Sequence, residues 1–141
     1  MPFDFAKINW LAVAVAALVA FFVGAIWYTA LFGKLWIKLH GFSDTKVKEM
    51  QANMSPPRFF GGMILSYLVL ALTLAVLLTG FAEPNLTAGV FLGLVFWMGS
   101  SAIAATGHIA SDKVHGVYLI DVGCHLVYLV LMGALLGAWR A

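Results

Sequence analysis

Hydrophobic residues along this chain gather in four long runs, and most charged residues lie between them. The runs cover residues 8–31, 59–81, 87–110 and 117–139. About 20 residues of helix, each rising about 1.5 Å, cross a hydrocarbon core about 30 Å thick, so each run is long enough to span it. The strict polar alternation of a membrane β-barrel does not occur. The pattern therefore predicts an all-α membrane protein, a bundle of four transmembrane helices forming a single domain over residues 1–141.

The first connection, residues 32–58, contains helical patterns of its own. A stripe continues the first helix past the membrane and consists of Leu31, Leu35 and Leu39. Gly41 is the residue expected to end this extension. After it, Ser43 and Asp44 are the candidate caps of a short helix that Pro56 and Pro57 would stop. The apolar face of this short helix would consist of Val47, Met50 and Met54. We expect it to be an amphipathic surface helix between the first two spans.

The other two connections, residues 82–86 and 111–116, are short. The second, third and fourth helices are therefore expected to be antiparallel neighbours. Of the eight Lys and Arg residues, six fall in or beside the first and third connections. Because cytoplasmic loops of membrane proteins carry an excess of Lys and Arg, we predict that loop 32–58 is cytoplasmic and that both termini face outward.

Composition agrees with a lipid environment. Of the 141 residues, 63% are hydrophobic and 10% are charged, and the mean hydropathy is +0.99, whereas a soluble domain has about a quarter charged residues. The net charge of +2 is too small for a nucleic-acid-binding surface, so nucleic acid is excluded as a partner and the lipid bilayer is the partner indicated. The single cysteine, Cys124, excludes an internal disulfide and should pack as a small hydrophobe.

Two ionisable residues in the last run carry most of the chemical interest. Asp121 and His125 are four residues apart and so share one face of a helix, which Tyr118, Tyr128 and Met132 extend. An ionised Asp inside a membrane costs about 2.5–3.5 kcal/mol on insertion scales, so Asp121 needs a partner, a water pocket or a proton. His125 is the nearest candidate partner. Further polar residues are expected at a similar depth in the cytoplasmic half, namely Tyr28, Tyr67, Ser101 and His108, and together with Tyr128 of the Asp121 face they complete the candidate site.

Three uses of these polar residues stay open: hydrogen bonds that hold the helices in register, a binding or proton-relay site, and a metal or catalytic site. His108, Asp121 and His125 are acceptable ligands for zinc or iron, but their spacing does not define a metal site. We therefore assign no metal, no cofactor and no catalytic residue. Signatures such as a phosphate-binding glycine loop, H-E-x-x-H or G-x-S-x-G do not occur, and nothing in the sequence supports an enzyme.

Small residues and tryptophans recur in the runs. Two GxxxG patterns lie in the third and fourth runs and consist of Gly89 with Gly93 and Gly133 with Gly137. Small residues let helix backbones approach closely, either within one chain or between subunits, so a homo-oligomer is a hypothesis. Four tryptophans lie near the predicted membrane interfaces, where aromatic residues form a belt. They are Trp10, Trp27, Trp36 and Trp139.

Several short motifs follow one another along the chain. The first half contains Asn9-Trp10, Gly24-x-x-Trp27-Tyr28 and Phe32-Gly33-Lys34-x-Trp36. The last run contains Leu119-Ile120-Asp121-x-Gly123-x-His125-Leu126 and Met132-Gly133-x-x-Leu136-Gly137-x-Trp139. Together they resemble the family called domain of unknown function 1761 over nearly the full chain. The resemblance implies a small four-helix protein of the bacterial inner membrane with no assigned activity. Cys124 departs from the family pattern, where an aromatic such as Tyr is expected.

These observations predict a non-enzymatic membrane protein that binds or passes a small solute, ion or proton through a cytoplasm-facing polar site. Asp121 and His125 would form its centre. One alternative is a structural or accessory membrane subunit in which the polar residues only fix helix packing. Another is a small membrane-embedded enzyme, in which a metal would take part.

Overall fold

The computed structural model describes residues 3–111 and 114–139, and most of these residues are helical. Its elements in chain order are a 3₁₀ turn Phe5–Lys7, α1 Trp10–Ile26, a π-helical segment Trp27–Leu31, α2 Gly33–His40, α3 Asp44–Asn53, α4 Pro56–Leu78, α5 Leu86–Ala110 and α6 His115–Ala138. The described residues contain no strand. The prediction of an all-α protein is confirmed.

Four helical stretches are long and apolar enough to cross a membrane. They are Trp10–Leu31, Pro56–Leu78, Leu86–Ala110 and His115–Ala138. Each begins and ends within three residues of the run that predicted it. The longest, α5, has 25 residues and is about 37 Å long, which exceeds the hydrocarbon thickness of a bilayer. The prediction of a four-helix membrane bundle is confirmed.

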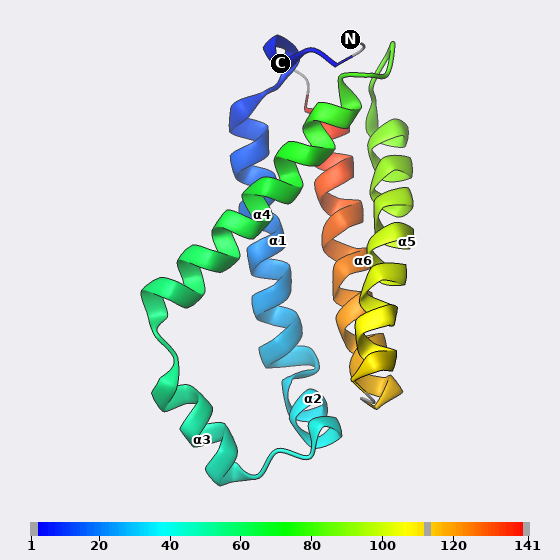
Figure 1. Cartoon of the computed structure of the whole chain (residues 1–141). Coiled ribbons are helices and arrows are strands. Elements are labelled where there is room, and N and C mark those ends of the chain that lie inside the picture. The colour runs from blue at the N-terminus through cyan, green and yellow to red at the C-terminus, as the bar shows by residue number, and fades with distance from the viewer. Residues whose placement is uncertain (1–2, 112–113, 140–141) are drawn as a thin grey trace.

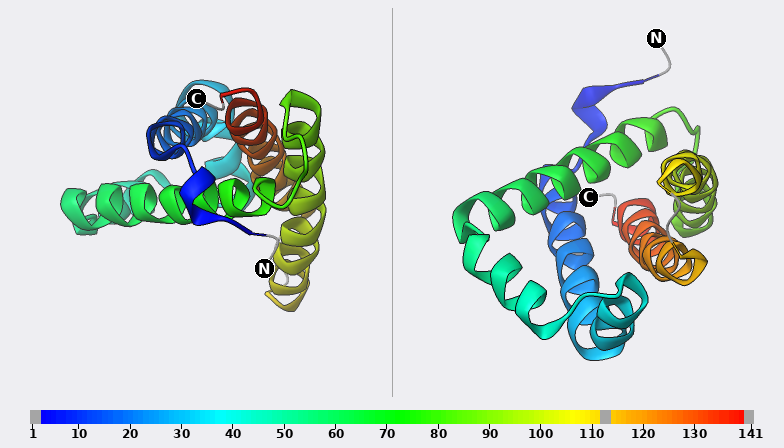
Figure 2. Two further views of the ribbon diagram at one scale, coloured as in Figure 1. Left: turned by 90° about the horizontal axis from the view of Figure 1, so that it is seen from above. Right: turned by 60° about the horizontal axis from the view of Figure 1, so that its bottom comes forward.

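The helix α6 is the centre of the bundle. Figures 1 and 2 show α1, α6 and α5 side by side, with α4 crossing them obliquely on one face. The contacts of α1 with α4 and α6 involve small, fully buried side chains such as Ala16, Ala20 and Ala71. Leu74 and Met132 fill the space between them. Because small side chains let helices approach closely, they account for this packing in a lipid environment.

The position of α4 differs from the sequence expectation. Its short connection to α5 predicted that the two helices would be neighbours along their length. Instead α4 packs mainly against α1, and Figure 1 shows it diverging from α5 away from their connection. The face of α1 that meets α4 is lined by buried alanines, which let helices pack closely. The first half of α4, residues 56–66, is exposed over most of its length.

The loop between α1 and α4 follows two of its sequence signals, but the first helix does not continue unbroken into it, because Phe32 leaves the helical conformation before α2. Gly41 ends α2 with a φ of 72°, in the left-handed region that glycine adopts without steric cost. The Ser43 side chain accepts a hydrogen bond from the Lys46 N–H and so caps α3. The prediction for Gly41 is confirmed, and of the two candidate caps Ser43 is the N-cap while Asp44 is the first residue of α3. The helix α3 ends at Asn53, and Pro56 opens α4, a position where proline loses no helical hydrogen bond.

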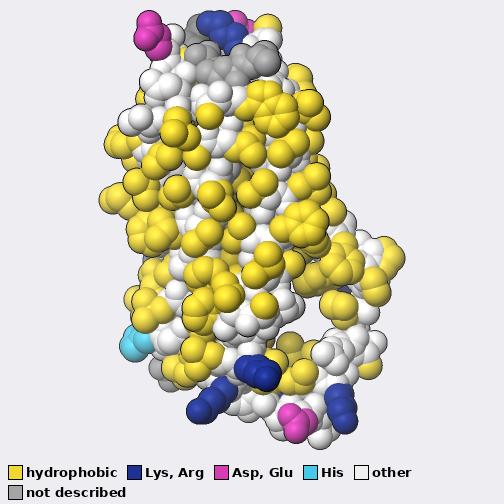
Figure 3. Space-filling model, turned by 180° about the vertical axis from the view of Figure 1, so that it is seen from behind, with side chains coloured by type: hydrophobic (Ala, Val, Ile, Leu, Met, Phe, Trp, Pro, Cys, Tyr) yellow, Lys and Arg dark blue, Asp and Glu magenta, His cyan; other side chains and the backbone are white. Residues whose placement is uncertain are grey.

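The molecular surface has an apolar middle and charged ends. Figure 3 shows hydrophobic side chains along the bundle, with Lys, Arg, Asp and Glu gathered at its two ends. On α5, the side chains of Phe91, Met98 and Ile103 are exposed by 59%, 65% and 74%. A soluble protein does not present so large an apolar surface to water. The chain is therefore a membrane protein whose apolar middle faces lipid.

Candidate functional site

The end of the first span is wound differently from the rest of the helix. From Trp27 to Leu31 the backbone is π-helical, and the Phe32 N–H donates a hydrogen bond to the Trp27 carbonyl oxygen at 2.8 Å, five residues back. Phe32 then leaves the helical conformation, and α2 starts at Gly33. Single π-helical turns inside helices occur frequently at functional sites. This turn carries two aromatic side chains that reach α6.

Both aromatic residues bond to neighbouring positions on α6. The Trp27 Nε1–H donates to the Ile120 carbonyl oxygen at 2.9 Å. The Tyr28 hydroxyl donates to Asp121 Oδ1 at 2.5 Å. Such a short distance is typical of a hydroxyl that donates to a carboxylate. Asp121 lies six residues into α6, about 9 Å along the helix from its start, so the bond joins two helices inside the apolar region.

The partner of Asp121 differs from the one that sequence spacing favoured. His125 was the nearest candidate because it lies one turn further along the same helix. In the structure the hydrogen bond comes from Tyr28, on the neighbouring helix. Side chains four residues apart lie one above the other along a helix, and the short Asp side chain points out from it. A long tyrosine from a facing helix meets that carboxylate directly.

A cavity of about 510 Å³ lies beside this bond, at the end of the bundle that carries α2. Small-molecule sites in proteins have volumes of about 300–1,000 Å³. The π-helical segment, α2, the end of α5 and the first half of α6 line it with Tyr28, Trp36, Ala104, Gly107, His108, Ser111, Tyr118, Asp121 and His125. Four of the seven candidate polar residues are therefore brought together: Tyr28, His108, Asp121 and His125.

The other three candidates lie outside this cavity. Tyr67 and Tyr128 pack edge to face in the core, with ring centroids 5.3 Å apart and exposed fractions of 7% and 8%. Tyr128 is seven residues beyond Asp121, about 10 Å deeper along α6. Gly24 leaves room for Tyr67, because a Cβ atom there would lie 2.9 Å from the Tyr67 hydroxyl. Ser101 is buried, and its carbonyl oxygen accepts the Tyr118 hydroxyl at 2.9 Å.

Two aromatic residues complete the lining and were not among the candidate site residues. Trp36 was assigned to the membrane interface, yet its ring lies 6.2 Å from that of Tyr28 at an interplanar angle of 82°. Tyr118 lies with its ring centroid 5.3 Å from the His108 ring. The available signal for Trp36 was its spacing of eight residues from Tyr28, close to two helical turns. For Tyr118 the signal was its place on the Asp121 face.

The lining combines one carboxylate with aromatic rings and imidazoles. Asp121 is the single acidic residue among the described residues of the lining, which include neither Lys nor Arg. Across the described chain, no three His, Cys, Asp or Glu side chains are grouped so that they could hold a metal ion. The groups present can accept a proton, bind a cation and donate hydrogen bonds.

The four glycines of the GxxxG patterns lie at the contact between α5 and α6. A Cβ atom on Gly89 would lie 1.9 Å from the Gly133 carbonyl oxygen, and one on Gly93 would lie 2.5 Å from the Leu129 carbonyl oxygen. A Cβ atom on Gly137 would lie 2.2 Å from the carbonyl oxygen of Asn85, the N-cap of α5. Of the two uses that the sequence left open, the structure places these glycines in packing within the chain. The close contact fixes the hairpin that carries His108 and Asp121.

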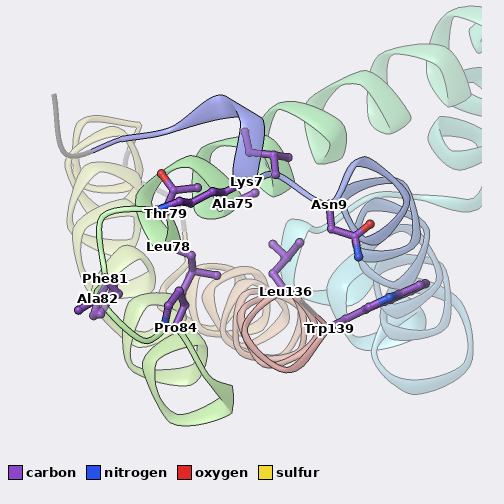
Figure 4. A pocket seen from close by; sticks show the side chains of 11 residues that line it. Lys7, Asn9, Ala75, Leu78, Thr79, Phe81, Ala82, Pro84, Leu136 and Trp139 are labelled. Atoms are coloured by element: carbon purple, nitrogen blue, oxygen red, sulfur yellow. The ribbon is translucent and has the colours of Figure 1, made fainter. Parts of the chain in front are cut away.

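A second, smaller cavity of about 120 Å³ lies at the opposite end of the molecule. Figure 4 shows Lys7, Asn9 and Thr79 around this cavity, with Leu136 and Trp139 on the side of α6. Most of its other lining residues are apolar, and it shares no lining residue with the Asp121 cavity. The chemically active groups of the membrane region therefore lie at the α2 end.

The tryptophans assigned to the interface occupy different places. Trp10 opens α1 and is 58% exposed, as expected of a belt residue, whereas Trp139 lines the smaller cavity. Trp27 donates a hydrogen bond to α6, and Trp36 lines the Asp121 cavity. Sequence depth alone does not distinguish these environments.

Comparison with known proteins gives one match. The family described as "Protein of unknown function (DUF1761)" matches the chain over residues 11–137. No curated protein and no solved structure matches it. The match covers both the π-helical turn and the Asp121 face of α6.

Proposed function

This chain belongs to the DUF1761 family of proteins of unknown function, and we propose that it binds a small solute, ion or proton in the cavity beside Asp121. Loop 32–58 and the α5–α6 connection hold six of the eight Lys and Arg residues, which favours a cytoplasmic position for that end in a bacterial inner membrane. The cavity then faces the cytoplasm and both termini face outward.

The observation that carries this proposal is the Tyr28–Asp121 bond at the wall of the cavity. Asp121 is the single Asp or Glu within the four apolar spans. An ionisable residue inside a membrane is costly and by default suggests a functional site. A bundle that used Asp121 only for packing would gain nothing from an adjacent cavity of about 510 Å³. Binding of a polar species explains both features.

Cysteine labelling tests whether the cavity is open to water. In a Cys124→Ala background, Ala104→Cys places a thiol in the lining, and Ile103→Cys places one on the adjacent lipid-facing position, which is 74% exposed on the molecule. Because the reactive species is the hydrated thiolate, we expect a membrane-impermeant maleimide to label Ala104→Cys about tenfold faster than Ile103→Cys. We expect this labelling in inside-out vesicles and not in right-side-out vesicles. Equal slow labelling at both positions would refute a water-connected site, and labelling from the outside would refute the orientation.

A structural role is the second candidate, because the Tyr28–Asp121 bond also joins α1 to α6. Hydrogen bonds between membrane helices contribute about 0.6 kcal/mol on average. Under this reading, Tyr28→Phe and Asp121→Asn each lower the free energy of unfolding by about that amount, and the double variant loses no more. The lining thiol would remain unlabelled, which separates this candidate from the first.

A further inference from the structure

The lining of the Asp121 cavity also indicates the class of ligand. Building on the proposed function above, we propose that the ligand is a small organic ammonium compound that carries a hydroxyl or other oxygen acceptor. Three independent features of the lining lead to this class: its charge, its aromatic rings and two buried polar atoms.

The charge of the lining favours a cation. Asp121 is the acidic residue of the described lining, and none of those residues is Lys or Arg. The Tyr28 hydroxyl donates to Oδ1, one of the two carboxylate oxygens. A carboxylate offers about four acceptor positions, so Asp121 can receive a further donor or a positive charge from the cavity. An anionic ligand would meet repulsion from the same group.

The rings of the lining favour an organic cation over a metal ion. Tyr28, Trp36 and Tyr118 all line the cavity, and the Tyr28 and Trp36 rings stand nearly at right angles to each other. A cation within about 6 Å of an aromatic face is attracted by the ring, and alkylated ammonium groups are recognised by several rings at once. A bare inorganic ion would fill only a small part of about 510 Å³.

Two buried polar atoms favour an oxygen acceptor on the ligand. Among the described residues, Trp36 Nε1 and His108 Nε2 are buried without a hydrogen-bond partner, and both residues line the cavity. An indole N–H can only donate. Buried polar groups in native proteins are nearly always hydrogen-bonded, so Trp36 lacks an acceptor, which a ligand would supply once the indole ring turns toward it. An amino alcohol supplies a positive charge for Asp121 and an oxygen for Trp36 in one small molecule.

An ammonium group of this kind has two sources. It can belong to a free solute or to the headgroup of phosphatidylethanolamine, because the cavity lies at a predicted membrane interface. The recognition chemistry is the same, so the experiment has an arm for each source.

The test is calorimetric titration of the purified full-length protein in a non-ionic detergent. Choline is the main probe. Its matched neutral analogue is 3,3-dimethyl-1-butanol, in which carbon replaces the charged nitrogen, and tetramethylammonium lacks the hydroxyl. We expect the neutral analogue to bind at least about tenfold more weakly than choline because it lacks the cation–aromatic and carboxylate attractions. We expect tetramethylammonium to bind about threefold to tenfold more weakly because it offers Trp36 no oxygen.

Two variants test which residues cause the differences in affinity among the three probes. Asp121→Asn should weaken choline binding about tenfold or more and leave the neutral analogue unchanged. Trp36→Phe keeps a ring but removes the N–H, so it should reduce the advantage of choline over tetramethylammonium. Circular dichroism confirms that each variant is folded. The comparison of the three probes on the unsubstituted protein needs no variant and stands if Asp121→Asn fails to fold.

The outcomes separate the ligand class from the proposed function. If the neutral analogue binds as tightly as choline, or if folded Asp121→Asn keeps full affinity for choline, the ammonium class is wrong. A labelled Ala104→Cys with no ammonium binding would overturn the ligand class alone, whereas an unlabelled one would overturn both. In phosphatidylglycerol nanodiscs, added phosphatidylethanolamine should weaken choline binding if the headgroup is the ligand and leave it unchanged if the ligand is a free solute.

Discussion

Replacing Gly89 with alanine should separate the two helices that hold the cavity. Gly89 lies on α5 against the backbone of α6, and a Cβ atom there would lie 1.9 Å from the Gly133 carbonyl oxygen. Cβ atoms essentially never come closer than 3.0 Å to another heavy atom, so α5 and α6 must move apart by about 1 Å. The obstacle is backbone and cannot rotate away, which makes the strain unavoidable.

The magnitude follows from two opposing effects. Overpacking of a close contact costs about 1–3 kcal/mol, and a gap of 0.5–1 Å forfeits about a quarter to a half of the dispersion energy of the facing atoms. Alanine in place of glycine restores about 1 kcal/mol of helix propensity. Gly99 lies on the same helix, and a Cβ atom there would have no neighbouring atom within 4 Å. Gly99→Ala therefore gains helix propensity without any cost of overpacking. The gain is common to both variants, so we expect Gly89→Ala to be less stable than Gly99→Ala by the cost of overpacking, about 1–3 kcal/mol.

The assay is unfolding by sodium dodecyl sulfate in mixed micelles, followed by far-ultraviolet circular dichroism. Gly99→Ala is the matched control, because it makes the same chemical change on the same helix. If Gly89→Ala were as stable as Gly99→Ala, the close α5–α6 contact would be wrong, and with it the placement of His108 and Asp121 in one cavity.

Three further predictions use the same purified protein. Tyr28→Phe removes the hydroxyl that bonds Asp121 and should lower the free energy of unfolding by about 0.6–1.7 kcal/mol in the detergent titration, whereas an unchanged midpoint would contradict the bond. Trp97→Phe removes the Nε1–H that donates to a backbone oxygen of α6 at 2.8 Å, and a loss of about 0.5–1.5 kcal/mol is expected in the same titration. Cys124 is 1% exposed, so mass spectrometry should find maleimide on it only after unfolding; rapid labelling of the folded protein would show that the core around it is open.

Helix positions were predictable because lipid leaves the backbone few choices. A segment crossing the hydrocarbon must satisfy its own hydrogen bonds, so long apolar runs become helices and their ends lie near the ends of the runs. Gly41 and Ser43 were predictable for a local reason, since the left-handed cap and the N-cap each depend on one residue type. The packing of α4 on α1 was not predictable from loop length, because it depends on the alanine face of α1.

The sequence predicted the depth of the candidate residues in the membrane but not the direction in which their side chains point. Asp121, His125, His108 and Tyr28 stood out as polar groups in apolar helices, and they do line one cavity. Tyr67, at a similar predicted depth, packs in the core instead, because depth along a helix does not give the direction in which a side chain points. The place of Trp36 in the cavity was not predictable, because the π-helical turn changes the direction in which α2 follows α1. No residue pattern in the sequence predicts that turn.

The central claim is that Asp121 lines a water-connected binding cavity and not a dry helix contact. Hydroxyl-radical footprinting of the unsubstituted protein in its membrane tests this most directly, since radicals form from water and mass spectrometry reads their products at each tyrosine. Tyr28 lines the cavity, whereas Tyr67 and Tyr128 are buried in the core. The structure predicts that Tyr28 is oxidised several times faster than Tyr67 and Tyr128. Equally slow oxidation of all three tyrosines would contradict the claim.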